Sequence, residues 1–371
     1  MQTFDTIVVG AGVAGAAAAY HLVEHGRTLV LEQFDLLHER GSSHGGSRIF
    51  RHAYEDHRYV RLAVAADAGW LALEALTGER LLVRTGGLDI GSVTARELDE
   101  VEEALRAAGR AVERLSAAQV AERFPAYRLD DDQEALHQAD AGILPATRCV
   151  ATMLRAAASA GATLHSRERV VRIRPVHDGV EVETDRGRYG AARLVVTAGA
   201  WLAAVLADLS LPLHVEQQQV LYVRVHDGRA FAPGRMPLFI DRRCGVYGFP
   251  LFERPDAIKI SDHQGAPTID LDERDDRIDP VRAADTIARA RSLLPELGDD
   301  LLDAQTCLYT KTPDEHFVLD RHPEHPQIVL GGGFSGHGFK FGPVLGEILT
   351  DLATRGRTEH DIGLFAATRF G

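Results

Sequence analysis

The sequence predicts an α/β fold in two parts: a Rossmann-like, dinucleotide-binding domain and an α+β domain with a mixed or antiparallel sheet. Three observations predict this fold. A short apolar run at residues 6–9 leads into a glycine-rich turn and an alanine-rich helix. Residues 215–260 change to a polar pattern of period two, which is typical of an antiparallel sheet. A second strand, glycine-rich loop and helix start follow at residues 328–343.

The first glycine-rich turn carries the signature of a dinucleotide site. Gly10 makes the turn, Gly12 lets the backbone approach a pyrophosphate, and Gly15 lets the helix lie close to the strand. The free N–H groups at the start of this helix attract phosphate. Glu32 ends the next predicted strand, where a carboxylate can accept hydrogen bonds from both ribose hydroxyls. The segment therefore predicts binding of an ADP moiety.

Composition shifts along the chain indicate that the dinucleotide-binding domain is interrupted twice. We assign residues 1–85, 145–214 and 305–371 to this domain. Residues 86–144 and 215–304 form the substrate domain, which would carry the catalytic side chains.

The remaining segments follow ordinary helix and strand periodicities. Residues 36–52 are crowded with glycine and serine, so we expect an irregular connection without strand or helix. Residues 163–197 resemble a small β-meander, and residues 81–90 a strand interrupted by two glycines. Helices are expected at 57–78, 94–108, 116–123, 147–160, 280–294 and 343–353.

Composition excludes several classes of protein. The 371 residues carry a formal charge of −13 without a run of basic residues, which argues against a nucleic-acid partner. No apolar segment approaches the roughly 18 residues that a membrane span needs. The three cysteines are widely spaced and odd in number, which argues against a disulfide framework. Because no targeting signal precedes the first strand, we expect a cytoplasmic protein.

The use of basic residues points to candidate functional lysines. Of 41 basic residues, only Lys259, Lys311 and Lys340 are lysine. An ammonium is compact and its pKa moves on burial, whereas a guanidinium stays charged and planar. Each lysine is therefore a candidate for a site that needs an ammonium, against the alternative of chance.

The C-terminal glycine-rich loop, residues 331–343, suggests a second contact with the cofactor. The helix that follows can stabilise an electron-rich ring edge such as the flavin pyrimidine, and Lys340 on the loop can add a full positive charge. Upstream, Cys307 and Tyr309 alternate along a strand and should point the same way. By itself Cys307 is more typical of a buried apolar residue than of a reactive thiol.

Two arginines in the irregular segment are candidate anion ligands. Arg48 and Arg51 could pair with a carboxylate or an anionic cofactor, with His44 nearby as a polar group that orients them. The alternative is two ordinary surface arginines.

Several long motifs together resemble the monomeric sarcosine oxidase and N-methyltryptophan oxidase group of flavin amine oxidases, over essentially the whole chain. They are Arg-Ile-Phe-Arg-His-Ala-Tyr at 48–54, Tyr-Gly-Phe-Pro at 247–250, Cys-Leu-Tyr-Thr-Lys-Thr at 307–312, Asp-Glu at 314–315 and Phe-Ser-Gly-His-Gly-Phe-Lys-Phe at 334–341.

The resemblance implies a set of roles. It implies FAD attached through a thioether to Cys307, and a substrate carboxylate held by Arg51 and Lys340. Arg48 would lie by the flavin, and Lys259 would hold water near flavin N5, where oxygen is reduced. Tyr247, His263 and Tyr309 would line the catalytic pocket, and the cofactor-binding residues would be Gly10, Gly12, Gly15, Glu32, His44, Val170, Gly336 and Gly338.

The chain departs from this group at two places. Ser43 and Gly46 replace a His and an Asp that are usual in the loop, which affects the hydrogen bonds expected there. Residues 251–257, before Lys259, also differ and would influence the size of the substrate.

The resemblance implies an FAD-dependent oxidase of N-methyl (secondary) amino acids such as sarcosine, acting as a monomer with O₂ and giving amino acid, aldehyde and H₂O₂. Alternative substrates are N-methyl-L-tryptophan and the cyclic imino acids proline and pipecolate. A nicotinamide dehydrogenase is a rival because Glu32 suits NAD equally, although a second glycine fingerprint is missing. A flavin-binding protein without turnover is a further rival, against which Arg51, Lys259 and Lys340 argue together.

Overall fold

The computed structural model describes residues 1–370 and arranges them around two large sheets. The strands of the first sheet are β1 (Gln2–Val9), β2 (Thr28–Leu31), β9 (Thr163–His165), β10 (Val170–Val176), β11 (Gly179–Thr184), β12 (Arg188–Val196), β18 (Val318–Arg321) and β19 (Ile328–Gly332). Their order is β10-β11-β12-β1-β2-β9, and β19 joins the second half of β12 with β18 beside it. The pairs β12–β1, β1–β2, β2–β9 and β12–β19 are parallel.

Both faces of this parallel centre are buried, which explains the continuous apolar run in β1. Val8 packs into the core on the helical side of the sheet, whereas Ile7 and Val9 pack into the core on the opposite side. All three side chains are buried because alternate residues of a strand point to opposite faces.

Three helices that are far apart in the chain cover the helical side: α1 (Val13–Leu22), α5 (Ala146–Ser159) and α8 (Gly342–Arg355). The helices α1 and α8 touch at Gly346, where an added Cβ would lie 2.5 Å from the backbone carbon of Ala17. The long helix α2 (His57–Thr77) lies next to α8. It begins at Asp56, whose carboxylate accepts a hydrogen bond from the Arg58 N–H, and ends at Gly78 in the left-handed conformation.

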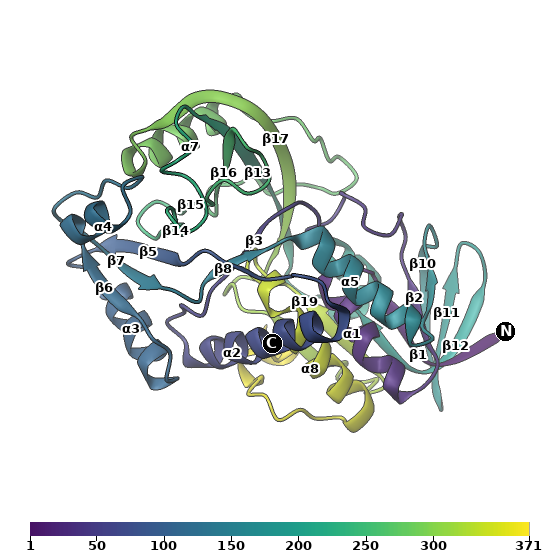
Figure 1. The fold of residues 1–371 in the computed structure, drawn as a ribbon. Helices are drawn as coiled ribbons and strands as arrows, with labels where there is room; N and C mark the ends of the chain where they lie inside the picture. Colours follow the sequence, from purple (N-terminus) through teal and green to yellow (C-terminus); the bar gives the residue numbers. More distant parts are fainter. Residues whose placement is uncertain (371) are drawn as a thin grey trace.

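The second sheet is almost wholly antiparallel. Its strands are β5 (Gly87–Ser92), β6 (Glu113–Ser116), β7 (Gln133–Gln138), β13 (His214–Val225), β14 (Leu238–Asp241), β15 (Val246–Gly248), β16 (Ala257–Asp262) and β17 (Leu297–Lys311). They follow the order β17-β13-β16-β15-β14-β5-β7-β6, in which only β14–β5 is a parallel pair among residues 1–370. Figure 1 shows β17 curving from this lobe toward the first sheet.

Shorter elements complete the chain. The helices α3 (Glu97–Ala107), α4 (Ala117–Arg123) and α7 (Pro280–Leu293) accompany the second sheet, and α6 (Leu202–Val205) lies after β12. Single turns of 3₁₀ helix are η1 (Val23–His25), η2 (Gly199–Trp201), η3 (Ala207–Leu209), η4 (Phe339–Phe341), η5 (Gly363–Phe365) and η6 (Ala367–Phe370).

A small third sheet corrects one expectation. The segment 36–52 is not wholly irregular, because β3 (Arg48–Phe50) pairs with β8 (Gly142–Leu144), which also pairs with β4 (Val83–Arg84). The partner strand lies almost a hundred residues away, so local glycine and serine content could not reveal it. The expected meander at 163–197 is also incomplete: β9 pairs in parallel with β2, and β12 lies in the sheet's parallel centre.

The predicted fold class is confirmed: a Rossmann-like α/β unit accompanies an α+β unit with a mostly antiparallel sheet. The domain limits stay a prediction. A search of the described helices finds none with the length and apolar character to cross a membrane.

Candidate active site

A cavity of about 1030 Å³ is lined by residues from both large sheets and from the loops between them. Every site residue predicted from the sequence lines this cavity except Gly15 and His44. The predicted residues at the wall are Gly10, Gly12, Glu32, Arg48, Arg51, Val170, Tyr247, Lys259, His263, Cys307, Tyr309, Gly336, Gly338 and Lys340.

The turn after β1 requires its glycines for different reasons. Gly10 has a φ of +96°, and an added Cβ would lie 2.5 Å from the Thr197 carbonyl oxygen. Gly15 sits one turn into α1, where a Cβ would lie only 1.9 Å from the carbonyl oxygen of Gly10. Gly15 therefore shapes the turn by close packing, as the sequence predicted, without lining the cavity itself.

The start of α1 is held by the loop that precedes β3. The Val13 N–H donates a hydrogen bond of 3.0 Å to the Ser43 hydroxyl, and a Cβ at Gly12 would lie 3.1 Å from the same oxygen. Ser43 is the first departure from the family pattern. Its small hydroxyl satisfies one of the helix's unpaired N–H groups and leaves the backbone at Gly12 accessible from the cavity.

Glu32 follows β2 and is buried beside the glycine turn. Its carboxylate accepts hydrogen bonds from the N–H groups of Ala11 (2.9 Å) and Phe34 (3.0 Å), and His38 Nε2 lies 3.4 Å away. Burial opposes ionisation of Glu32, but these hydrogen bonds outweigh it and hold the pKa below its usual value. The residue thus presents a fixed anionic acceptor at the edge of the cavity, as a ribose site needs.

Cys307 lies on β17 with its sulfur next to a guanidinium. Arg48 Nη2 lies 3.7 Å from Sγ and also donates to the carbonyl oxygen of Ser42, while Nη1 donates to that of Ser47. The Ser42 hydroxyl in turn donates to the carbonyl oxygen of Leu308, which joins the loop to β17. Cys307 is buried, and it lines the cavity.

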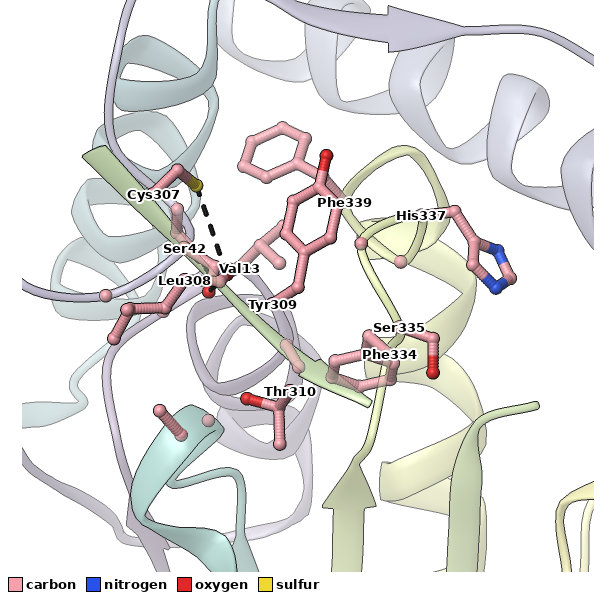
Figure 2. Close-up of a pocket in the computed structure, with 18 of the residues that line it drawn as sticks. Val13, Ser42, Cys307, Leu308, Tyr309, Thr310, Phe334, Ser335, His337 and Phe339 are labelled. Atoms are coloured by element: carbon pink, nitrogen blue, oxygen red, sulfur yellow. Dashed lines mark hydrogen bonds between the residues drawn. The ribbon is translucent and has the colours of Figure 1, made fainter. Parts of the chain in front are cut away.

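Tyr309 extends from the same strand toward the glycine-rich loop after β19 (Figure 2). Gly336, with a φ of +80°, allows this approach, because a Cβ there would lie 2.3 Å from the Tyr309 ring. The Tyr309 hydroxyl lies 3.1 Å from that of Tyr247, and its ring centroid lies 5.4 Å from that of His263.

These three aromatic groups are uncharged at neutral pH. Burial raises the pKa of Tyr247 and, more strongly, that of Tyr309. Burial, together with the nearby Lys311 ammonium, lowers the pKa of His263 to about 4. This part of the wall therefore offers neutral donors and acceptors.

Arg51 is held in an ion-pair network that sequence reasoning missed. Its Nη1 lies 3.3 Å from Asp89 Oδ1, and Arg242 Nε donates to the same oxygen at 3.1 Å. Arg242 also pairs with Glu55. Asp89 is a buried carboxylate on β5, so the second sheet orients the guanidinium of Arg51.

Lys340 lies in η4 and, like Arg51, lies close to the ring of Tyr54. Its ammonium donates to the Tyr54 hydroxyl (2.8 Å) and to the His337 carbonyl oxygen (2.6 Å). Lys340 Nζ and the Arg51 guanidinium carbon lie 5.3 Å and 4.5 Å from the centre of the Tyr54 ring. Burial, aided by Arg51, lowers the pKa of Lys340 well below its usual value. A bound carboxylate would favour its charged form.

Lys259 lies on β16, and its side chain is almost completely buried. Its Nζ donates to the Ser47 carbonyl oxygen at 3.0 Å and to Glu253 Oε1 at 3.2 Å. Burial and the neighbouring Arg48 guanidinium lower the pKa of Lys259 to about 8, against the opposing pull of Glu253. The ammonium is therefore the main form of Lys259 below pH 8.

His44 lies behind the wall of the cavity. It is buried, and within residues 1–370 neither ring nitrogen has a hydrogen-bond partner. Burial and the positive charge of Arg48 lower the pKa of His44 to about 4. The structure thus places a neutral imidazole next to Arg48 and not among the lining residues, so a direct contact with the cofactor stays a prediction.

The residues that sequence reasoning missed share one property. Each contacts a charged side chain of the site. Tyr54, Asp89 and Glu253 contact the predicted residues Lys340, Arg51 and Lys259, in that order. Arg242 contacts Asp89. Tyr54 ends the Arg-Ile-Phe-Arg-His-Ala-Tyr motif, and Glu253 lies in the 251–257 segment that departs from the family pattern, so these two had a signal in the sequence. No group of three or more potential metal ligands lies together in the described part of the chain.

These features define a class of protein, a dinucleotide-dependent oxidoreductase. The cavity has a dinucleotide turn and an acidic ribose acceptor at one end, and cations with neutral aromatic groups at the other. One end of the cavity suits an ADP moiety, and the other suits a redox-active ring with a small anionic substrate.

The comparisons with known proteins agree. Residues 5–352 match the family described as FAD dependent oxidoreductase (DAO), so the chain belongs to that family. It is 39% identical to monomeric sarcosine oxidase of Streptomyces avermitilis, over 99% of this chain and 98% of that relative. It is 34% identical to N-methyl-L-tryptophan oxidase of Salmonella arizonae, over 99% of each chain. The solved structure of NikD, "an unusual amino acid oxidase", is 27% identical with a TM-score of 0.85, covering 99% of this chain and 98% of that one.

The resemblance to the sarcosine oxidase and N-methyltryptophan oxidase group is thereby confirmed, as is the prediction of a flavin amine oxidase that depends on FAD. The cavity fits this cofactor. Gly12 at the start of α1 has no capping side chain, Glu32 is held as an anion, and Gly336 and Gly338 of the glycine-rich loop line the cavity. The nicotinamide dehydrogenase is excluded as an interpretation by this family membership.

Proposed function

We propose that this chain oxidises N-methyl (secondary) amino acids such as sarcosine, with O₂ as the electron acceptor, and that it acts as a monomer. The observation that carries the proposal is the convergence of Arg51 and Lys340 on one aromatic ring at one end of the cavity. Two cations so close together suit a carboxylate, which each can bind directly.

Arg51 and Lys340 would then fix the orientation of the substrate. The planar guanidinium can bind a carboxylate with two hydrogen bonds, while the ammonium supplies a point charge. Because Asp89 and Tyr54 hold these groups in place before the substrate arrives, little ordering is needed on binding. Orientation of the amine toward the reacting ring supplies a large share of the rate.

The same cations would favour the reactive form of the amine. Oxidation requires the neutral amine, because its lone pair must be free. A cavity wall with Arg51, Lys340 and a neutral His263 disfavours an additional positive charge. The site would therefore bind the carboxylate and lower the pKa of the amine in one arrangement.

The reaction balances as sarcosine, O₂ and water giving glycine, formaldehyde and H₂O₂. Bound FAD supplies the two-electron acceptor for the carbon–nitrogen bond and returns those electrons to O₂. Lys259 would stabilise negative charge that develops on oxygen during its reduction, since a buried ammonium acts strongly on a nearby anion. Tyr247 and Tyr309 would shield the reacting groups from water with Phe249 and Phe339, which line the same cavity.

Covalent attachment at Cys307 belongs to the same proposal. The sulfur lines the cavity on the strand that also carries Tyr309, and Arg48 accompanies it. Neither Cys149 nor Cys244 lines the cavity, so no other thiol in the described chain is placed for this bond.

A peroxide assay with purified holoenzyme tests the substrate. We expect H₂O₂ with sarcosine and less with N-methyl-L-tryptophan, L-proline or L-pipecolate, the alternatives open from the sequence. A preference for one of these larger amines would replace sarcosine as the substrate, and no turnover of any secondary amino acid would contradict the proposal.

Covalent attachment has a separate test. The intact mass of denatured wild type should include FAD, and Cys307→Ser should lose this addition while Cys244→Ser retains it. A wild-type mass without FAD would contradict attachment and leave the substrate proposal standing.

A further inference from the structure

A glutamate outside the predicted set is tied to the buried lysine. Glu253 lies in the loop between β15 and β16, within the segment that departs from the family pattern. Its Oε1 accepts from the Ser47 hydroxyl (2.5 Å) and from Lys259 Nζ (3.2 Å). Its Oε2 accepts from the Gly46 N–H (3.1 Å) and from the Tyr222 hydroxyl (2.8 Å). Four donors thus fix one carboxylate.

The second departure from the family pattern makes room for this carboxylate. A Cβ at Gly46 would lie 2.4 Å from Glu253 Oε2, so any side chain at position 46 would compete for the same space. Position 46 is not in the left-handed region, so conformation does not require glycine there. The departures at Gly46 and in the 251–257 segment are therefore parts of one arrangement.

The carboxylate also controls where Lys259 points. The ammonium has two hydrogen-bond acceptors, Glu253 Oε1 and the Ser47 carbonyl oxygen. The position of Ser47 is itself fixed by Glu253, through the Ser47 hydroxyl and the Gly46 N–H. Removal of this one carboxylate would weaken both anchors.

The charge balance around Lys259 gives Glu253 a second effect. Burial and Arg48 oppose the ammonium, whereas Glu253 favours it. Phe249 lies beneath it with its ring centre 5.3 Å from Nζ, and Tyr222 on β13 bonds the far oxygen of Glu253. Burial opposes ionisation of Glu253, but Lys259, Ser47 and Tyr222 outweigh it and lower its pKa, so the carboxylate is charged at neutral pH.

We propose that Glu253 is the positioning residue for Lys259: it fixes the direction of the ammonium and keeps it protonated against burial and Arg48. This inference rests on the proposed function, in which Lys259 assists the reduction of O₂. Glu253 does not line the main cavity, so it acts through Lys259 and does not contact the substrate.

The small number of lysines makes a direct measurement possible. Lysine labelled with ¹⁵N at Nζ gives at most three side-chain signals in this chain, and Lys259→Met assigns one of them. In the holoenzyme we expect the Lys259 signal to titrate with a midpoint near pH 8. In Glu253→Gln the midpoint should fall by about one pH unit, because the carboxylate that stabilises the ammonium is lost.

A matched control tests whether the lowered Lys259 midpoint is specific to Glu253, or follows the loss of any glutamate that is paired with a lysine. Glu315 lies 2.8 Å from Lys311 Nζ, so Glu315→Gln should move the Lys311 signal and leave the Lys259 midpoint in place. An unchanged Lys259 midpoint in Glu253→Gln would overturn the proposal. This readout does not depend on turnover, so it stands even if the oxidase activity is not found.

Stopped-flow kinetics give the functional readout. A midpoint near pH 7 in place of 8 leaves about one tenth of Lys259 protonated at pH 8, so oxidation of the reduced enzyme by O₂ should slow about fivefold there. Reduction by the amine should change little, and the difference should shrink toward pH 6. Equal loss in both half-reactions at every pH would show a merely structural role and overturn the proposal.

A rescue variant covers the case in which Glu253→Gln does not fold. Glu253→Ala combined with Gly46→Asp returns a carboxylate to the same space from the other side. We expect this double variant to restore the Lys259 midpoint toward pH 8, whereas Glu253→Ala alone should show the lowered value. A double variant with the same midpoint as Glu253→Ala would count against the proposal.

Discussion

The two ends of the cavity are built in different ways. At the nucleotide end, Gly10, Gly15 and Glu32 lie within 23 consecutive residues and act through backbone geometry and one buried carboxylate. At the cationic end, Arg51 and Lys340 are separated by almost three hundred residues and meet only over the ring of Tyr54. The first is a property of a local motif, and the second is a property of the whole fold.

This difference shows which parts tolerate change. A glycine turn has no substitute, because its neighbours are main-chain atoms that cannot move aside. A charged group can reach one place from several positions of the chain, because a long side chain can span the gap, as Glu253 does in reaching the space beside Gly46. We therefore expect substitutions at the nucleotide end to abolish cofactor binding and those at the cationic end to change individual steps.

The largest effect should come from Gly15→Val. The new side chain would meet the Gly10 carbonyl oxygen at 1.9 Å, which costs about 3 kcal/mol or more and forces α1 away from β1. We expect purified protein without FAD, measured as the ratio of flavin to protein absorbance. Gly363→Ala is the control, since its Cβ would meet nothing closer than an Asp361 carboxylate oxygen at 3.8 Å and Gly363 does not line the cavity. Full FAD content in Gly15→Val would contradict the expectation that substitutions at the nucleotide end abolish cofactor binding.

Lys259→Met should have the next largest effect and separate the two half-reactions. Loss of a preorganised charge in a dry site costs roughly 100- to 1000-fold in rate. Stopped-flow kinetics should show this loss for the reaction of the reduced enzyme with O₂, while reduction by the amine changes far less. If both half-reactions fall equally, the role assigned to Lys259 is wrong.

Arg51→Met should act on the substrate and leave FAD in place. Loss of one partner of a buried ion pair costs about 3 kcal/mol, so kcat/KM for sarcosine should fall roughly 100-fold. Asp89 keeps its hydrogen bond from Arg242 in this variant, so its buried carboxylate is not left unpaired and the local structure should be preserved. The intact mass should still include FAD. A variant without FAD would show that the two ends do not act separately.

The smallest effect is a pH dependence that arises from Lys340. Because its pKa is lowered by burial and by Arg51, the ammonium of the free enzyme is lost as pH rises through a range well below that of ordinary lysine. In the proposed function the ammonium binds the substrate carboxylate, so kcat/KM should fall by up to tenfold per pH unit in that pH range. Lys340→Arg should abolish this fall of kcat/KM with pH, called the alkaline limb, since a guanidinium does not titrate. Persistence of the limb in Lys340→Arg would assign it to another group.

The sequence predicted the parts of the site that depend on neighbouring residues. The glycine turn, the helix after it, Glu32 and the second glycine-rich loop all have spacings that fix local structure. The alternation of Cys307 and Tyr309 correctly placed both on one side of β17, in one buried cluster. Family motifs then supplied Arg48, Arg51, Lys259 and Lys340, which the structure brings to one cavity.

The rest depends on contacts between distant segments. Asp89 could be found only once β5 was known to pass beside Arg51, and β3 only once β8 was known to pair with it. Glu253 had a faint signal, because the resemblance leads us to expect an aspartate at position 46, and the glycine found there leaves a carboxylate to be supplied from elsewhere. Nothing in the local sequence said which residue would supply it.

The most direct test of the account is the binding of methoxyacetate, in which an ether oxygen replaces the amine of sarcosine and no oxidation follows. Titration of the holoenzyme, followed by the visible flavin absorbance, should give saturable binding for the wild type. The Kd should rise roughly 100-fold in Arg51→Met and in Lys340→Met, for a loss of about 3 kcal/mol in each. The neutral analogue 2-methoxyethanol should not bind. Unchanged affinity in both variants would contradict the claim that these two cations hold the substrate carboxylate.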